Sequence, residues 1–203
     1  YELEQTWEGG YLKVAGAGEY PEEVILTTEE DSTRRVFDVT AGNSLALENV
    51  MLYDTDTNGD GGAVRGVGAD ITLNNVAAVE NRCTGDGGAV SVSSGTLTIT
   101  DSSFQYNESD DDGGAVAVSS SDLNGSGNLY YSNEAVRGGA ILIESSKVNL
   151  TGSEITGNEA EDQGGGIAIV GGSHVHIERM LITENTATVD GGGVSISDLE
   201  DDD

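Results

Sequence analysis

The sequence contains very little proline, cysteine and lysine. Its 203 residues include one proline and 30 glycines, and the glycines lack the one-in-three period of collagen, so collagen and proline-rich disorder are excluded. The one cysteine, Cys83, excludes a disulfide within the chain. No apolar run approaches the roughly 18 residues that a membrane-spanning helix needs, so we expect no membrane insertion.

Positive charge is also scarce. Eight Lys and Arg residues stand against 37 Asp and Glu residues, which gives a formal net charge of −29. Nucleic acid is therefore not expected as a partner, because phosphate contacts require clustered Lys and Arg. Self-repulsion at this charge destabilises a compact state unless salt or bound cations screen it. The balance favours an extracellular location, with a saline or calcium-rich surrounding and a halophilic source.

What the sequence does contain is an internal repeat. Two glycines, then Ala or Gly, then Val or Ile, recur six times, beginning at Gly61, Gly87, Gly113, Gly138, Gly164 and Gly191. Successive copies are 26, 26, 25, 26 and 27 residues apart. Repeats of this length are typical of solenoids, in which each repeat packs only on its neighbours.

Each copy contains three short segments with the pattern of a strand. Apolar residues alternate after the glycines, as Val90 and Val92 do, and a second alternating pair, such as Leu97 and Ile99, follows. A third segment, such as residues 104–107, ends in asparagine. The connections lack a regular two-residue hairpin signature, so each strand is expected to pair with its equivalent one coil later, about 4.8 Å away.

The sequence therefore predicts an all-β fold, a right-handed parallel β-helix of about seven coils with three short strands in each. The β-helix is predicted over residues 23–199, with strands of degenerate coils at 24–28, 36–39 and 45–47. Residues 1–22 fit no coil and are interpreted as an N-terminal cap or an inter-subunit arm, with Trp7, Tyr11, Leu12 and Tyr20 over the open end. Residues 200–203 are an acidic tail, and no comparable cap is predicted at the C-terminal end.

Asparagine marks one corner of each coil. The third segment of successive copies ends at Asn81, Asn107, Asn133, Asn158 and Asn185. In a parallel coil these side chains lie one strand spacing apart, so we predict that they hydrogen-bond along the axis as a structural ladder.

Gly-Gly-Ala-Val-like motifs alternating with Phe-x-x-Asn-like motifs over residues 50–197 resemble the polymorphic outer membrane protein repeats. Residues 104–107 with 113–116 are the copy closest to this pattern, and other copies replace Phe with Tyr, Ile, Leu or Ala. These repeats are best known from the passenger regions of chlamydial autotransporters. The resemblance implies a secreted or surface-displayed β-helix that serves in adhesion or as structural material.

Carboxylates are concentrated at the corner before each pair of glycines. Asp54, Asp56, Asn58 and Asp60 surround Gly59 in an order that resembles the start of an EF-hand or dockerin calcium loop. The match is incomplete, because Arg65 stands where such a loop has its bidentate Glu. The residue just before the glycines is, in successive copies, Asp60, Asp86, Asp112, Arg137, Gln163 and Asp190.

Stacking of the coils would place Asp60, Asp86 and Asp112 one strand spacing apart, with the carboxylates of residues 110–111 beside them. Carboxylates this close must protonate, splay outward or bind a cation. Ca²⁺ takes six to eight oxygen ligands and suits such a column. The alternative is an acidic, solvated turn that ordinary salt neutralises, or whose end Arg137 neutralises.

Four exposed polar residues are further candidates. His174 and His176 are two apart on one strand and therefore share a face, and the apolar residues that alternate with them take the inward slots. We expect exposed polar side chains there rather than a transition-metal site. Asn124 and Asn149 match the Asn-x-Ser/Thr pattern and are the predicted glycosylation sites, whereas Asn107 also matches but is expected to be shielded in the ladder.

A catalytic site is not predicted. Some polysaccharide lyases and hydrolases use a β-helix, and Arg137 with Asp112 or Asp162 would supply charged groups, but ladder packing explains these residues as well. The copies of the repeat differ in length by only one or two residues, so no long loop is available to wall a cleft. The chain is therefore expected not to be an enzyme.

The leading hypothesis is a non-enzymatic extracellular structural protein. It would be a surface adhesin or stalk segment, or the subunit of a head-to-tail surface filament. The alternative is a carbohydrate-binding or polysaccharide-cleaving β-helix module. The expected partners are other copies of the chain and a host, cell-surface or glycan receptor.

Overall fold

The computed structural model describes residues 3–8, 10–18, 20–29 and 32–197, with side chains from residue 10 onward. The predicted acidic tail at 200–203 and the predicted covering role of the Trp7 side chain lie outside this description. Within it, the chain is all β apart from one three-residue 3-10 helix, η1 (Pro21–Glu23). No helix in these ranges is long and apolar enough to cross a membrane.

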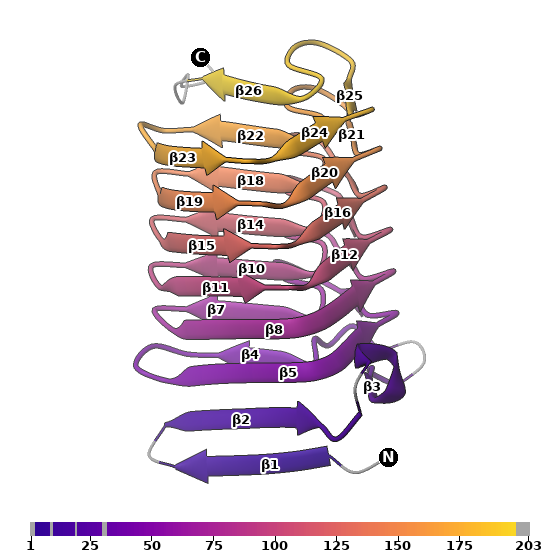
Figure 1. Cartoon of the computed structure of the whole chain (residues 1–203), viewed down its shortest axis with the longest axis vertical. Helices are drawn as coiled ribbons and strands as arrows, with labels where there is room; N and C mark the ends of the chain where they lie inside the picture. The colour runs from indigo at the N-terminus through magenta and orange to yellow at the C-terminus, as the bar shows by residue number, and fades with distance from the viewer. Residues whose placement is uncertain (1–2, 9, 19, 30–31, 198–203) are drawn as a thin grey trace.

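The strands form a stack of coils (Figure 1). Strands at the front run to the right, strands behind them run to the left, and the chain climbs from its N-terminal to its C-terminal end, which makes the coil right-handed. Equivalent strands of successive coils pair in parallel, and the sheet that follows the glycine pairs has seven strands. The predicted parallel β-helix of about seven coils is confirmed.

The strand after each pair of glycines belongs to this seven-stranded sheet, called sheet B. Its members are β4 (Phe37–Val39), β7 (Val64–Val67), β10 (Val90–Ser93), β14 (Val116–Ser119), β18 (Ile141–Glu144), β22 (Ile167–Val170) and β26 (Val194–Ser197). Val90 lies opposite Val64 on one side and Val116 on the other. The register therefore places equivalent residues of the repeat in columns, as predicted.

The second and third predicted strands form sheet A. In two early coils they are one continuous strand of ten residues, β5 (Ser44–Tyr53) and β8 (Asp70–Val79). Later coils divide the same path in two, giving β11 (Thr96–Thr100) and β12 (Ser103–Gln105), β15 (Asp122–Ser126) and β16 (Leu129–Tyr131), β19 (Lys147–Thr151) and β20 (Glu154–Thr156), and β23 (His174–Glu178) and β24 (Leu181–Thr183).

A third sheet, sheet C, consists of strands of two residues that directly follow the asparagine corner. They are β6 (Asp56–Thr57), β9 (Arg82–Cys83), β13 (Glu108–Ser109), β17 (Glu134–Ala135), β21 (Glu159–Ala160) and β25 (Thr186–Ala187). The sequence did not predict these strands, because two residues are too few to show an alternating pattern.

The first described strands form a hairpin that extends sheet A. β1 (Leu3–Glu8) pairs antiparallel with β2 (Tyr11–Gly16), and β2 pairs in parallel with β5. β3 (Ile25–Leu26) joins β5 farther along. The sequence predicts no coil before residue 23, whereas β2 continues sheet A and its Val14 is buried in the core. Of the predicted covering residues, Leu12 packs against the core, while Tyr11 and Tyr20 are exposed.

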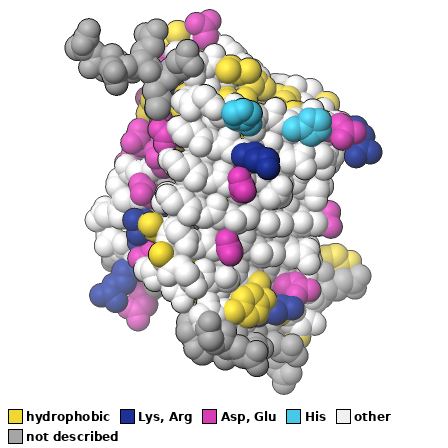
Figure 2. All heavy atoms as spheres, turned by 90° about the vertical axis from the view of Figure 1, so that its left-hand side faces the viewer, with side chains coloured by type: hydrophobic (Ala, Val, Ile, Leu, Met, Phe, Trp, Pro, Cys, Tyr) yellow, Lys and Arg dark blue, Asp and Glu magenta, His cyan; other side chains and the backbone are white. Residues whose placement is uncertain are grey.

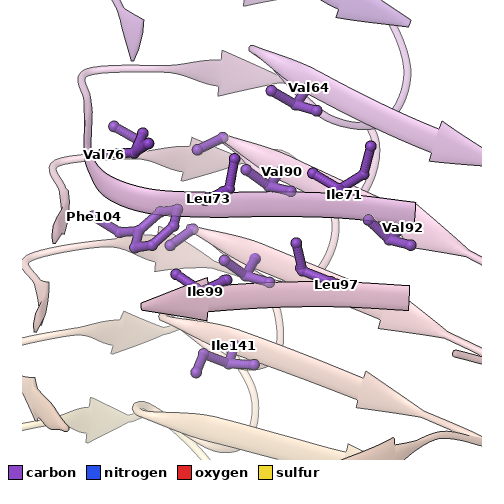
Figure 3. Packing of buried hydrophobic residues seen from close by; sticks show 14 of the residues in the cluster. Val64, Ile71, Leu73, Val76, Val90, Val92, Leu97, Ile99, Phe104 and Ile141 are labelled. Carbon is purple, nitrogen blue, oxygen red and sulfur yellow. The ribbon is translucent and has the colours of Figure 1, made fainter. Parts of the chain in front are cut away.

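Columns of equivalent apolar side chains fill the interior of the coils (Figure 3). Val64 and Val90 form part of one column, and Ile71 and Leu97 form part of another on the facing sheet. Phe104 stacks on Tyr130 with ring centroids 5.1 Å apart. Because the interior is packed with side chains, any binding must use the corners, the outer faces of the sheets or the two ends.

The glycine pairs permit a tight corner between sheets C and B. Gly87 has a φ of 76°, a left-handed conformation that is unfavourable for a residue with a Cβ atom. A Cβ atom on Gly88 would overlap the carbonyl oxygens of Gly114 and Glu108 in the next coil. The repeat signature therefore marks a corner where the backbones of successive coils lie too close together for a side chain between them.

Burial declines in the last coil. Ile169 in β22 is 6% exposed, whereas Ile196, its partner in β26, is 77% exposed. Val189 and Leu181 in the same coil are 60% and 50% exposed. The C-terminal end of the described stack therefore presents apolar side chains and the outer edges of the last strands.

Candidate functional site

The five asparagines of the predicted ladder lie above one another at one buried corner. The side-chain amide of Asn107 donates to Asn133 Oδ1 (2.9 Å), and that of Asn133 donates to Asn158 Oδ1 (2.8 Å). Each of these oxygens also accepts the backbone N–H of the preceding rung. Asn81 and Asn185 extend the column at its two ends. The ladder gives partners to polar atoms that are otherwise cut off from water.

A threonine begins this column. Thr55 is buried, and its Oγ1 donates to Asn81 Oδ1 at 2.8 Å. The sequence did not predict this rung because the residue type changes. The only feature of the sequence that indicates Thr55 as a rung is its position, 26 residues before Asn81.

Two other hydrogen-bonded columns were also missed. Ser121, Ser146 and Ser173 accept backbone N–H groups of the preceding coil where the chain enters sheet A. Ser102, Asn128 and Ser153 do the same where sheet A bends. The sequence indicates these columns only by a small polar residue that recurs every 25 to 27 residues. Such a pattern is hard to distinguish from the serines that are common on protein surfaces.

The predicted aspartate column exists at the corner before the glycines, and it has a structural role. Asp60 Oδ1 accepts the backbone N–H of Asp86, and Asp86 Oδ1 accepts that of Asp112. Asp112 Oδ1 in turn accepts the backbone N–H of Arg137. Each carboxylate thus bonds to the next coil, which offsets part of the repulsion between neighbouring charges.

Arg137 ends this column. Its Nε lies 3.1 Å from both Asp112 oxygens, and one of its terminal nitrogens, Nη2, lies 2.6 Å from Asp112 Oδ2. The Asp112 side chain is 6% exposed and that of Arg137 is 35% exposed. Hydrogen bonding to the Asp112 carboxylate raises the pKa of Arg137. The guanidinium is thus the counter-ion of the buried Asp112 carboxylate.

Three carboxylates at this corner meet in one place. Oxygens of Asp86, Asp111 and Asp112 lie within 4.8 Å of one another. Burial is the main cause that raises the pKa of Asp86 to about 6, and the nearby Asp111 carboxylate is the second cause. Burial and the Asp112 carboxylate also raise the pKa of Asp111. Of the His, Cys, Asp and Glu side chains described, only this group meets the geometry for a shared ion, and its hard oxygens suit Ca²⁺.

The loop that resembles an EF-hand start is arranged differently. Asp54, Asp56 and Asn58 are exposed, whereas the alternating Thr55 and Thr57 are buried. This in-and-out alternation belongs to an extended chain that follows the wall of the coil, and a calcium loop must instead curl around its ion. The structure brings Asp86 and Asp112 together with Asp111, and it leaves Asp54 and Asp56 outside the group.

The remaining candidates lie on the outer face of sheet A. Asn124, Asn149 and His176 are neighbours in register, and so are Asp122, Lys147 and His174. All six side chains are exposed. Asn107, the third match to the glycosylation pattern, is buried in the ladder and is not accessible to a modifying enzyme.

Cys83 is buried in the wall of the coil and donates a hydrogen bond to the Gly85 carbonyl. Burial raises the pKa of its thiol to about 11. Very little thiolate is therefore present at neutral pH, so this cysteine does not have the properties of a nucleophile.

Comparisons with protein-family models, with curated proteins and with solved structures gave no match to this chain. The repeat architecture therefore rests on the structure itself, which is that of a β-helical repeat protein.

Proposed function

We propose that this chain is a non-enzymatic extracellular structural protein of the polymorphic outer membrane protein repeat type, and that it serves as a rigid stalk or as the subunit of a surface filament. The observation that carries the proposal is the unbroken register of the coils. From β6 onward successive coils are bonded along three sheets, and the asparagine and aspartate columns add bonds between several of them. Such a rod resists bending, because every bend must break or stretch several columns at once.

The C-terminal end supports assembly from head to tail. Ile196, Val189 and Leu181 expose apolar surface there, next to strand edges that offer backbone N–H and C=O groups. Exposed edges of this kind pair readily with another β-structure. A contact between two different ends of the molecule does not close on itself, so repeated copies would grow as a filament.

The net charge of −29 sets the conditions for this assembly. Copies repel one another at low ionic strength, and salt shortens the range of that repulsion to about 10 Å at 0.1 M. We therefore propose that the protein assembles in a saline or calcium-rich exterior and stays dispersed at low salt.

Sedimentation and electron microscopy over a range of salt concentrations test the proposal. The variant Ile196→Asp places a charge at the C-terminal end and is expected to remain monomeric when the wild type forms rods longer than one chain. Tyr131→Asp, on the side of the rod, is the matched control and should assemble normally. A wild type that is monomeric at every salt concentration, or variants that assemble equally well, would contradict head-to-tail assembly.

A further inference from the structure

The outer face of sheet A carries an open recess near the C-terminal end. It has a volume of about 660 Å³, within the range of small-ligand sites, and β15, β19 and β23 form its floor. Six polar side chains line it, namely Asp122, Asn124, Lys147, Asn149, His174 and His176. Parallel pairing in register holds them in two adjacent columns, so that three successive coils, about 10 Å from first to last, contribute to one surface.

This recess gathers an unusual share of the basic groups of an acidic protein. It contains both histidines and one of the two lysines of the chain. Figure 2 shows the two histidines in cyan close to a Lys or Arg side chain in dark blue. In the same view an acidic side chain lies directly beside this basic group, and the rest of the face carries further acidic and basic side chains.

Lys147 differs from most other cations of the protein. Arg65, Arg82 and Arg137, for example, lie within 4.0 Å of carboxylates. Lys147 makes no ion pair of this kind with any residue that the structure describes, although Asp122 is its neighbour in register. Its ammonium group is therefore available to a ligand.

The other lining groups suit a ligand that carries hydroxyl groups. Asn124 and Asn149 each offer a side-chain amide that donates and accepts, and the Asp122 carboxylate accepts hydrogen bonds. A second recess of about 510 Å³ shares Asp122, Lys147 and His174 and continues over the corner, where Ser120 and Ser145 add hydroxyl groups. The two recesses together form a polar path across neighbouring coils rather than a closed pocket.

We infer that this path binds an acidic saccharide chain, with Lys147 on a uronate carboxylate and with Asn124, Asn149 and Asp122 on the sugar hydroxyls. The histidines extend the donor surface beside Lys147. The site does not depend on assembly of the protein, because all of its groups come from one chain. It also spans several sugar positions, since its groups follow the axis of the coil over three turns.

Calorimetric titration of the whole chain with a short oligosaccharide of galacturonic acid tests the inference. We expect one binding site per chain, and we expect Lys147→Gln to weaken binding about tenfold or more, the effect of losing one hydrogen bond to a charged group. Lys13→Gln is the matched control. It removes the other lysine, which also lies on sheet A but pairs with Glu48 in the first coils, and it should leave the affinity unchanged.

Two further ligands decide what the site recognises. A neutral galactose oligosaccharide of the same length should bind much more weakly, and inorganic sulfate should not reach the affinity of the uronate. Equal affinities of the Lys147→Gln and Lys13→Gln variants would overturn the inference. So would a neutral sugar that binds as tightly as the uronate, or sulfate that binds as tightly as the oligosaccharide.

Discussion

Arg137 holds the Asp112 carboxylate with both its Nε and a terminal nitrogen, and this pair ends the column of aspartates that begins at Asp60. The residue before the glycines is acidic in three successive coils and basic in the fourth. The change of sign places a guanidinium next to the most buried carboxylate of the column. The column is thus neutralised from within the chain at one end, while Asp86 and Asp111 keep their raised pKa values nearby.

The first prediction concerns Arg137. Replacing it by Met leaves the buried Asp112 carboxylate without its counter-ion, and we expect the free energy of unfolding at pH 7 to fall by about 2–3 kcal/mol. Urea unfolding followed by circular dichroism measures the change. Arg179→Met is the control, because Arg179 pairs with Glu178 on the surface and should contribute less than about 1 kcal/mol. The double variant Asp112→Asn, Arg137→Met should recover part of the loss. A double variant as unstable as Arg137→Met would contradict this account.

The sequence could predict the part of the fold that repeats. Alternating apolar residues indicate the strands, as at Val90 and Val92 and at Leu97 and Ile99. The spacing of the repeat then determines which residues of successive strands pair. The asparagine corner could be predicted equally well, because the same residue type recurs there in successive copies. These features are visible because six copies repeat the same physical requirement.

Features without copies could not be predicted in this way. The antiparallel pairing of β1 with β2 occurs once in the chain. A Gly-Gly pair at residues 9–10 precedes β2, but Tyr11 and Leu12 follow it in place of Ala and Val, so the repeat does not indicate that β2 continues sheet A. The grouping of the carboxylates could not be predicted for a different reason. Residues 54–60 match a ligand order along the chain, but an extended wall strand points alternate side chains inward and outward, and the carboxylates that converge come from two neighbouring coils.

A second prediction concerns the asparagine ladder. In Asn133→Ala the backbone N–H and side-chain amide of Asn107, the Phe104 carbonyl and Asn158 Oδ1 all lose a partner in the buried interior. We expect the free energy of unfolding to fall by about 3 kcal/mol or more, since each unsatisfied buried group costs roughly 1–3 kcal/mol. Asn124→Ala removes the same side chain from an exposed position and should change stability by less than about 0.5 kcal/mol. Equal stabilities of the two variants would show that the ladder does not stabilise the coil.

A third prediction follows from the raised pKa of Asp86. Its value of about 6 in the folded protein lies above the ordinary value of 3.8, so between about pH 4 and pH 6 the folded state holds a proton that the unfolded state has lost. The contribution of Asp86 to stability therefore falls as the pH rises through this window, and it stays unfavourable at pH 7.

The variant Asp86→Asn tests this directly. The amide keeps an oxygen that can accept the Asp112 N–H but cannot ionise, so the variant should be more stable than wild type at pH 7 and should lose less stability between pH 4 and pH 6. Urea midpoints measured across this range give the comparison. Asp70→Asn, which changes an exposed carboxylate in β8, should reproduce the wild-type slope. If Asp86→Asn has the wild-type slope as well, the pH dependence arises elsewhere.

The last prediction is that calcium stabilises the protein through Asp86, Asp111 and Asp112. Ca²⁺ accepts irregular sets of carboxylate oxygens, whereas Mg²⁺ demands a compact octahedron and gives up its water reluctantly, so Ca²⁺ should have the larger effect. At a concentration ten times its dissociation constant, a bound ion adds about 1.4 kcal/mol to the free energy of unfolding and raises Tm by about 3–5 °C.

Asp111→Asn should reduce this rise in Tm. Asp110→Asn, which removes the neighbouring carboxylate that pairs with Arg82, should preserve it. Because Arg137 competes for Asp112, the Arg137→Met variant should gain more from calcium than wild type. Identical melting with calcium, with magnesium and with a chelator would leave the aspartate column as a purely structural feature, neutralised by Arg137 and by ordinary salt.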